Sequence, residues 1–307
     1  MAQIINTNLP SLNAQRNLNT TQGALAQSIQ RLSSGLRVNS AKDDAAGLAI
    51  AERMNAQVRG MNVAMRNAND GISMAQTAES ALGKIGDMLQ RMRELSVQAA
   101  NATNSDSDRA ALQEEFTELQ DEITRTADTT RFNGQAVLTS TNSFDFQVGA
   151  NATQDDQVSI RSVNVLGTST TSGTNDGALS EVTGTGLSIT SAGTRGSAAS
   201  PGDFEAYMAG TAGTGALGAI EQIDFALAQV NSARSQFGAA QNRFESVIAN
   251  LQVASESQSS ARSRIMDADF AAETAAMTRA QVLQQAGVAM LAQANQLPQN
   301  VLSLLKG

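Results

Sequence analysis

The stretch MNAQVRGMNVAMRNANDGISMAQTAESALGKIGDML, residues 54–89, decides the fold. Every seventh residue in it is apolar, in the series Met54, Met61, Ala68, Ala75, Leu82 and Leu89. Four residues after each lies a second track that turns polar towards its end: Val58, Met65, Ile72, Glu79, Gly86 and Arg93. An apolar residue at every seventh position forms a stripe along one face of an α-helix that packs on another helix. We therefore predict one long, unbroken helix here.

The same repeat occurs in two further segments. One carries Leu112, Phe116, Leu119 and Ile123, after acidic residues suited to a helix N-terminus, Asp106 and Asp108; the other carries Ile223, Val230, Phe237, Phe244 and Leu251. Residues 54–99 as one helix would span about 70 Å. A compact globule of this chain length is only about 50 Å across. We therefore predict a mainly α, elongated fold in which long helices from both termini pack antiparallel, as in a coiled coil.

The pattern changes between the two helical halves. Phe132-Asn133-Gly134, followed by the alternating apolar residues Phe144, Phe146 and Val148, predicts a β-hairpin region. Gly, Ser and Thr then dominate from about Gly167 to Ser200, which indicates a small, irregular or β-containing central insert. Its hydroxyls between Thr168 and Ser200 are either solvated loop residues or sites of O-glycosylation.

The composition argues against several functions. The chain has no His and no Cys, so it lacks the commonest general base, the commonest metal ligand and any disulfide. Its net charge of -8 opposes nucleic-acid binding, and no apolar run is long enough to span a bilayer. Asp43, Asp44, Asp267 and Asp269 suit helix caps better than a metal site. We expect no enzyme activity, no cofactor or metal, no nucleic-acid partner and no membrane insertion.

Weaker repeats occupy both ends of the chain. They comprise Leu18, Leu25 and Leu32 with Ile29 and Leu36, and then Leu283, Met290, Leu297 and Leu304, flanked by Ala280, Gly287, Ala294 and Val301. Ordering about 40 terminal residues costs roughly 1–2 kcal/mol each in backbone entropy. Burying about eight large side chains returns only about 1.5–3 kcal/mol apiece. We therefore predict that copies of the chain bury these residues, and that the ends become helical only on polymerisation.

Longer motifs carry a family resemblance. RLSSGLRVNSAKDDAAGLAIA (31–51), ANDGISMAQTAESAL (68–82) and LQRMRELSVQAAN (89–101) resemble the N-terminal half of bacterial flagellin. TRFNGQAVL (130–138) and FQVGANA (146–152) resemble its hairpin region. SRIMDADFAAETAAMTRAQVLQQAGVAMLAQANQLPQNVLSLL (263–305) is similar to its C-terminus. The resemblance covers residues 1 to about 165 and about 215 to 307, leaving only the insert unmatched.

The resemblance implies a structural role and a division of the chain. It implies a secreted, extracellular subunit that polymerises with itself into a helical filament used for motility. The implied partners are a flagellar cap, hook–filament junction proteins, an export chaperone and the type III export apparatus. Terminal segments 1–42 and 261–307 would form an inner polymerisation tube (D0), and 43–165 and 215–260 an outer tube (D1), with 166–214 as a variable surface insert.

Three residues resemble a recognition site in the family. Arg91, Leu95 and Glu115 match flagellin positions bound by a host Toll-like receptor of innate immunity. In the alternative interpretation, Arg91 and Glu94 form an exposed ion pair one turn apart, while Leu95 packs against a neighbouring subunit. Both can hold, because a receptor can bind a surface that also serves packing.

Other functions remain as alternatives. The hook–filament junction protein shares the terminal pattern, although the ANQLPQNVLSLL ending and the intact SAKDDAAGLAI favour flagellin. Membrane-surface binding by the amphipathic ends is a second alternative, but their polar faces lack the usual enrichment in Lys and Arg. A peptidase inserted in the variable region would require paired His residues, which this chain does not contain.

Overall fold

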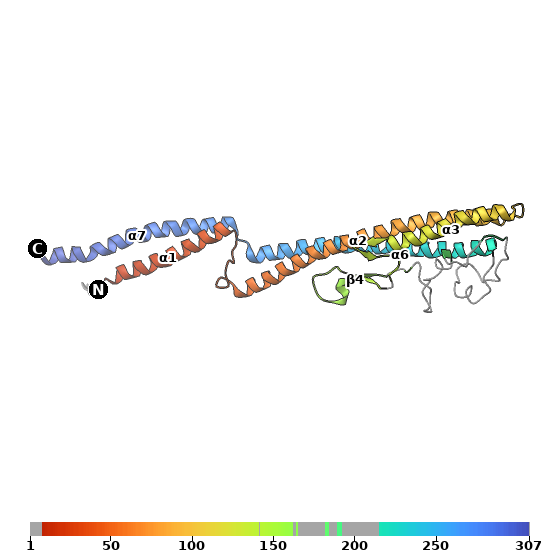
Figure 1. Cartoon of the computed structure of the whole chain (residues 1–307). Coiled ribbons are helices and arrows are strands. Elements are labelled where there is room, and N and C mark those ends of the chain that lie inside the picture. The colour runs from red at the N-terminus through yellow and green to blue at the C-terminus, as the bar shows by residue number, and fades with distance from the viewer. Residues whose placement is uncertain are drawn as a thin grey trace. The chain divides into compact units, whose positions relative to one another are not determined.

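The computed structural model describes residues 8–140, 142–161, 164, 182–183, 189–191 and 215–306, with residues 297–306 described for the backbone alone. Its long helices are α1 (Leu9–Ser34), α2 (Ala45–Ala99), α3 (Asp106–Thr129), α6 (Gly215–Met266) and α7 (Phe270–Lys306) (Figure 1). Its short elements are strands β1 (Arg131–Phe132), β2 (Gln135–Ala136), β3 (Phe144–Gln147) and β4 (Gln157–Ile160), and the 3-10 turn η1 (Gln154–Asp156). The predicted mainly α class is confirmed.

The chain forms two compact units. One comprises Met1–Arg59 with Ala254–Gly307, and the other comprises Gly60–Val253. We call them the terminal unit and the central unit. Helical structure breaks between α1 and α2 and again between α6 and α7. The five-segment division at residues 42, 165, 214 and 260 stays a prediction.

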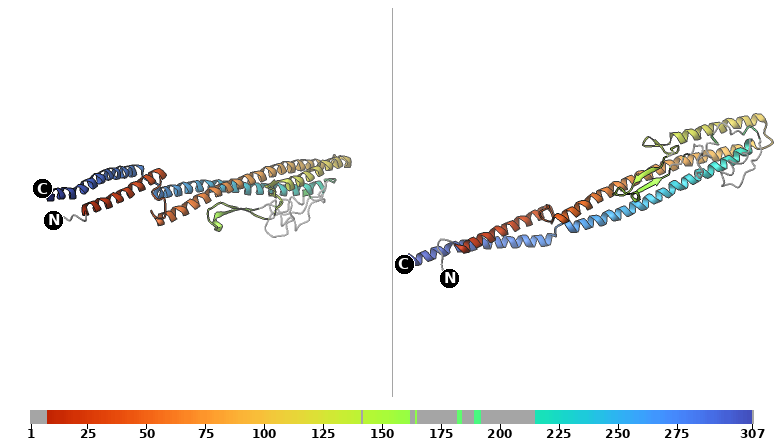
Figure 2. Two further views of the ribbon diagram at one scale, coloured as in Figure 1. Left: turned by 60° about the vertical axis from the view of Figure 1, so that its left-hand side comes forward. Right: turned by 90° about the horizontal axis from the view of Figure 1, so that it is seen from below.

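Helices α2 and α6 run antiparallel in the central unit, as the two views of Figure 2 show. Glu79 accepts a hydrogen bond from Gln241 at 2.9 Å, and further along α2 Arg93 pairs with Asp224 at 2.7 Å. Residue numbers thus rise along α2 as they fall along α6. The predicted antiparallel packing of the two halves is confirmed for this unit.

The core of the central unit contains the apolar series that the sequence indicated. Ala68, Ala75, Leu82 and Leu89 of α2 are buried in one cluster with the α6 residues Ile223, Val230, Phe237 and Phe244, and Met61 is buried as well. From α3, Phe116 and Ile123 are buried in the same core. A seven-residue repeat therefore identified the correct inward face of each helix.

The second track on α2 was predicted wrongly. After Met61 the buried residues lie three positions after each member of the first series, not four, and they are Ala64, Gly71, Ala78, Ile85 and Met92. Most of them are small, so the larger side chains at Val58, Met65 and Ile72 dominated the pattern although they are only half-buried. Small residues permit close approach of a neighbouring helix. A Cβ added at Gly71 would lie 2.7 Å from the ring of Phe244.

Local chemistry explains where α3 and the hairpins begin. The Ser105 hydroxyl accepts from the Asp108 N–H while the Asp108 carboxylate accepts from the Ser105 N–H, which forms a capping box at the start of α3. Asn133 and Gly134 both have positive φ, as the two-residue turn between β1 and β2 requires. The predicted hairpin is confirmed.

A second hairpin, β3 with β4, packs on the helices of the central unit. Its strands pair antiparallel with Phe146 opposite Val158. The Phe146 ring meets that of Phe244 edge-to-face at 5.5 Å, and Asn67 of α2 donates to the Gln147 carbonyl. The sequence did not indicate β4. The predicted insert at 166–214, with the hydroxyls of Thr168 to Ser200, lies almost wholly outside the described residues.

A small cluster joins the helix breaks of the terminal unit. Val38, Ala51 and Met266 are buried there, with Leu36 packed against them. Leu36 and Asp267 form a backbone bridge. The expected capping roles of Asp44 and Asp269 are confirmed, because their carboxylates accept the N–H groups at the first turns of α2 and α7. None of the described helices is long and apolar enough to cross a lipid bilayer.

Candidate assembly surface

Helices α1 and α7 pack antiparallel through an interface of small and polar residues. Of the side chains described on these two helices, the buried ones are Ser11, Ser28, Ala280 and Ala294. The Ser11 hydroxyl donates to the Asn295 side chain at 2.9 Å, and Asn8 donates to the Ala294 carbonyl at 2.8 Å. We call this contact the α1–α7 seam. Its fully buried side chains have little apolar surface to bury, because they are Ser and Ala.

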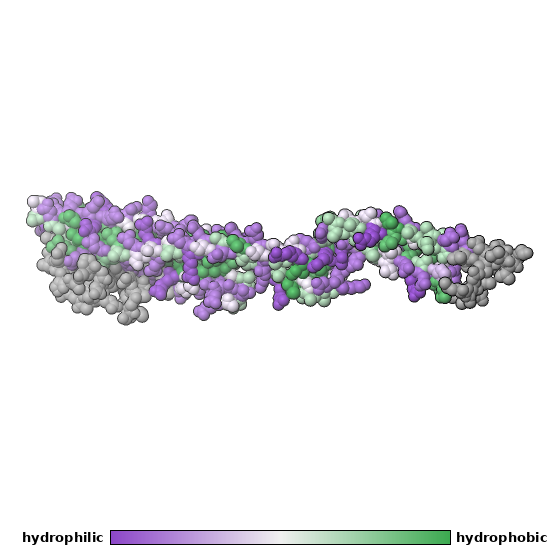
Figure 3. Space-filling model, turned by 180° about the vertical axis from the view of Figure 1, so that it is seen from behind, coloured by the Kyte–Doolittle hydropathy of each residue, from purple (hydrophilic) through white to green (hydrophobic). Residues whose placement is uncertain are grey.

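Many large apolar side chains of the two helices are exposed to solvent. Eight of them are between 47% and 65% exposed: Leu9, Leu12, Ile29, Phe270, Val282, Leu283, Val288 and Met290. We call this set the outward apolar face. Hydrophobic surface is visible over the terminal unit toward the right of Figure 3. Exposed apolar side chains that gather in a patch are typical of an interaction surface.

The predicted polymerisation residues divide between these two environments. Leu18, Leu25 and Leu32 are half-buried at the seam, where a Cβ at Gly287 would touch Leu18 at 3.4 Å. Ile29, Leu283 and Met290 belong to the outward apolar face. Leu36 packs at the helix breaks instead. Leu297, Val301 and Leu304 lie where only the backbone of α7 is described.

Charge is sparse along this surface. Residues 280–305 contain no charged side chain at all. At the other end of the seam, Arg31 and Glu273 approach to 3.9 Å, with Glu273 the more buried of the two. Burying a charged group costs much free energy because the ion loses its water. A helix face without charges can be buried in an apolar contact without that cost.

The predicted receptor site is assembled only in part. Arg91 pairs with Glu115 of α3 at 2.7 Å and with Glu94 at 3.0 Å, and the hydrogen bond that it donates to Glu115 raises the pKa of the guanidinium. The expected Arg91–Glu94 pair is therefore confirmed. Leu95, however, is 1% exposed and packs in the core of its own chain. In this structure neither a receptor nor a neighbouring subunit can reach it, because it occupies the inward face of α2.

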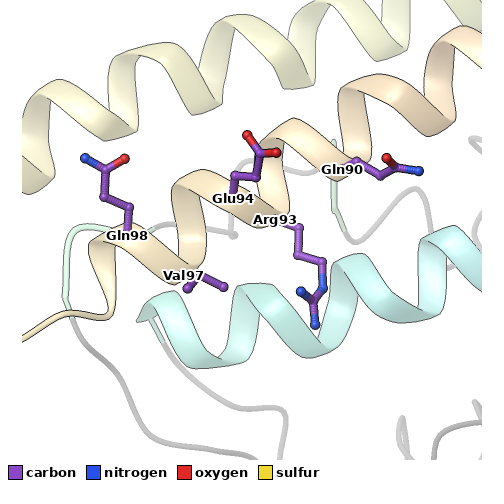
Figure 4. Close-up of a pocket in the computed structure, with 5 residues that line it drawn as sticks. All are labelled: Gln90, Arg93, Glu94, Val97 and Gln98. Carbon is purple, nitrogen blue, oxygen red and sulfur yellow. The ribbon is translucent and has the colours of Figure 1, made fainter.

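An open groove of about 530 Å³ runs along one face of α2, lined by Gln90, Arg93, Glu94, Val97 and Gln98 (Figure 4). Glu94 and Gln98 point toward α3, while Arg93 points toward α6, where it pairs with Asp224. Its lining holds no nucleophile paired with a base. Across the part of the chain that the structure describes, no group of three His, Cys, Asp or Glu side chains gathers to hold a metal.

Long helices, together with exposed apolar side chains on the two terminal helices, are typical of a structural subunit that packs with other helices through its ends. Comparison with known proteins identifies the family. The model of the bacterial flagellin N-terminal helical region matches residues 5–143, and that of the C-terminal helical region matches residues 220–305. The chain belongs to the bacterial flagellin family. It is a structural subunit of the bacterial flagellar filament and polymerises with itself, as the resemblance implied.

Relatives and solved structures agree with this assignment. The chain is 45% identical to a flagellin of Halalkalibacterium halodurans and 36% identical to the B-type flagellin of Pseudomonas aeruginosa, over 99% and 100% of this chain and the full length of both relatives. A putative flagellar hook-associated protein of Vibrio parahaemolyticus has a similar fold, with a TM-score of 0.53 and 13% identity, over 73% of this chain and all of that one. The alternative of a hook–filament junction protein is not favoured, since that likeness shows the fold alone.

Proposed function

We propose that the outward apolar face is the surface through which subunits of the filament bury one another. This proposal rests on the arrangement of α1 and α7, in which the fully buried side chains are Ser and Ala while Leu283 and Met290 are exposed. In the central unit the large residues are inside. A helix pair with its apolar side chains outward gains stability only from a further apolar partner, and the partner that polymerisation supplies is another copy.

The gain on assembly is substantial. Fully burying one large apolar side chain contributes about 1.5–3 kcal/mol, so the remaining exposed half of each contributes roughly 1 kcal/mol. The eight described residues together would contribute roughly 8 kcal/mol per subunit before the cost of association. One charged residue on the face removes a large part of that, because an unpaired ion must then be buried.

A charge substitution on α7 tests the proposal. Leu283→Asp should abolish seeded polymerisation of purified monomer, measured by sedimentation and electron microscopy, while the circular dichroism of the monomer stays close to wild type. Gln285→Asp is the matched control, because it places the same charge on the same turn at an exposed polar position. Normal filaments from Leu283→Asp would refute the proposed surface.

We further propose that the chain leaves the cell through the type III export apparatus with an export chaperone. It would then be added to the filament under a cap protein, beyond the hook–filament junction proteins. Support comes from flagellin relatives over the whole chain and from terminal helices whose large apolar side chains are partly left exposed. A motile host expressing the chain tests this: the protein should appear in the extracellular fraction, and accumulation inside export-competent cells would contradict it. We propose no catalytic role.

The exposed Arg91–Glu115 pair supports a second proposal, recognition by a host Toll-like receptor. The pair presents a polar surface shared by α2 and α3. Arg91→Ala should lower the response of receptor-bearing reporter cells, whereas Lys84→Ala, which removes another exposed cation of α2, should not. Inert wild-type monomer, or an unchanged response to Arg91→Ala, would end this proposal.

A further inference from the structure

One thioether stands out among the methionines of this chain. Of the methionine side chains that the structure describes, Met290 alone is exposed, with 65% of its surface in contact with solvent. Met61, Met74, Met92 and Met266 are buried, and the others are half-buried. Small oxidants modify methionine according to its access to solvent. Met290 is therefore the most exposed thioether in the described part of the chain.

The position of Met290 gives that modification a consequence. Met290 follows Leu283 by seven residues on α7 and lies within the charge-free run 280–305. We propose that Met290 is an oxidation site that controls entry of the subunit into the filament, an inference that rests on the assembly surface proposed above. The oxidant class is a peroxide, and the modified subunit is the free monomer.

The chemistry balances without any group supplied by the protein. A lone pair on the Met290 sulfur attacks one oxygen of hydrogen peroxide and the O–O bond breaks, which yields methionine sulfoxide and one molecule of water. The sulfur is oxidised by two electrons and the peroxide is reduced by two. A dithiol reductant, acting through a methionine sulfoxide reductase, returns the thioether and forms a disulfide and water.

The sulfoxide should weaken assembly while leaving the fold of the monomer unchanged. In the free monomer the added oxygen remains in water, and Met290 lies outside the core of the central unit, so the fold of that unit is untouched. In the filament the same oxygen would enter an apolar contact, where a polar group without a hydrogen-bond partner is unfavourable. We expect the monomer concentration needed for polymerisation to rise roughly tenfold or more. Assembled filaments should protect the thioether from the oxidant.

The experiment oxidises the protein before and after assembly. Monomer and preformed filaments receive the same limited dose of hydrogen peroxide, and mass spectrometry of peptides measures the sulfoxide at each methionine. Seeded polymerisation is then followed by sedimentation. Met290→Leu keeps an apolar side chain but has no sulfur, and Met290→Gln mimics the polarity of the sulfoxide without any oxidant.

Each outcome of this experiment supports or overturns the oxidation proposal. The proposal predicts faster oxidation of Met290 in monomer than in filaments, loss of polymerisation in step with that sulfoxide, recovery with reductase and dithiol, and no loss in Met290→Leu. Equal loss in oxidised Met290→Leu, or normal polymerisation of monomer carrying the Met290 sulfoxide, would overturn it. If polymerisation survives the sulfoxide but not Leu283→Asp, only the oxidation proposal fails. If it survives both, the assembly surface itself is wrong.

Discussion

The close contact between Gly71 and Phe244 makes a sharp prediction about the central unit. Adding a methyl group at Gly71 would place a Cβ 2.7 Å from the Phe244 ring, which is fully buried and packs edge-to-face on Phe146. Gly83 lies in the same helix, and a Cβ there would meet no atom within 4 Å. Gly71→Ala and Gly83→Ala are therefore the same substitution in one helix, with and without a clash.

The expected magnitudes differ in sign. Replacing Gly by Ala in a helix interior raises the free energy of unfolding by about 0.8–1 kcal/mol, so Gly83→Ala should be stabilising. Gly71→Ala has the same gain, but overpacking a well-filled core costs about 1–3 kcal/mol. We expect Gly71→Ala to be neutral or destabilising by up to about 2 kcal/mol, which leaves the two variants about 1–3 kcal/mol apart.

Native-state hydrogen exchange is the suitable assay, because the chain forms two units and a single unfolding transition is not assured. Protection of the α2 amides around each site reports the opening free energy of the central unit. Phe244→Leu supplies a double-mutant cycle, since the shorter side chain should cost less in the Gly71→Ala variant than beside the native glycine. Equal stabilisation by Gly71→Ala and Gly83→Ala would refute the close approach of α2 and α6.

Three further predictions address the caps and the terminal helices. Ser105→Ala removes the capping box of α3 and should lower the opening free energy of the α3 amides by about 1 kcal/mol in native-state hydrogen exchange, whereas no loss would mean that the cap is dispensable. Hydrogen bonds from the Ser40 hydroxyl and backbone N–H hold the pKa of Asp43 below its ordinary value. These bonds should therefore stabilise the connection before α2 at pH values above the ordinary pKa, and the stabilisation should be lost as the pH falls through the lowered pKa. A carbon-detected NMR titration that finds an unshifted pKa for Asp43 would contradict this. Backbone NMR of dilute monomer should lack stable helical signals for 9–34 and 270–306, and dispersed helical signals there would show that these helices need no other copy.

The sequence predicted the helices well because the seven-residue repeat records which residues face a neighbour. It located Leu82 and Phe237 in the core and the turn at Asn133-Gly134 without error. It misplaced the second track of α2, since the inward positions Ala64 and Gly71 are small and give no hydrophobic signal. Side-chain size was mistaken for burial, although a small side chain is what close helix packing selects.

The same limit affected the candidate sites. Leu283 and Met290 repeat every seven residues, as seam residues do, yet they lie on the outward apolar face. Leu95 stands one turn from the exposed Arg91 and is nevertheless buried. A repeat shows which residues share a helix face, but which neighbour packs on that face depends on the tertiary or quaternary structure. The spacing alone therefore could not tell a contact within the chain from a contact between chains.

The two units apply one packing rule in opposite directions, and this difference connects the fold to polymerisation. In the central unit Leu82, Phe237 and Phe244 are inside, so its core is complete within one chain. In the terminal unit Ser11 and Ala280 are inside while Leu283 is outside. A unit that buries its own apolar residues has a stability independent of subunit concentration, whereas a unit that needs another copy is stabilised by mass action. The proposed surface therefore makes order in α1 and α7 depend on assembly, because the contacts that hold these helices in place would be those that hold one subunit to the next.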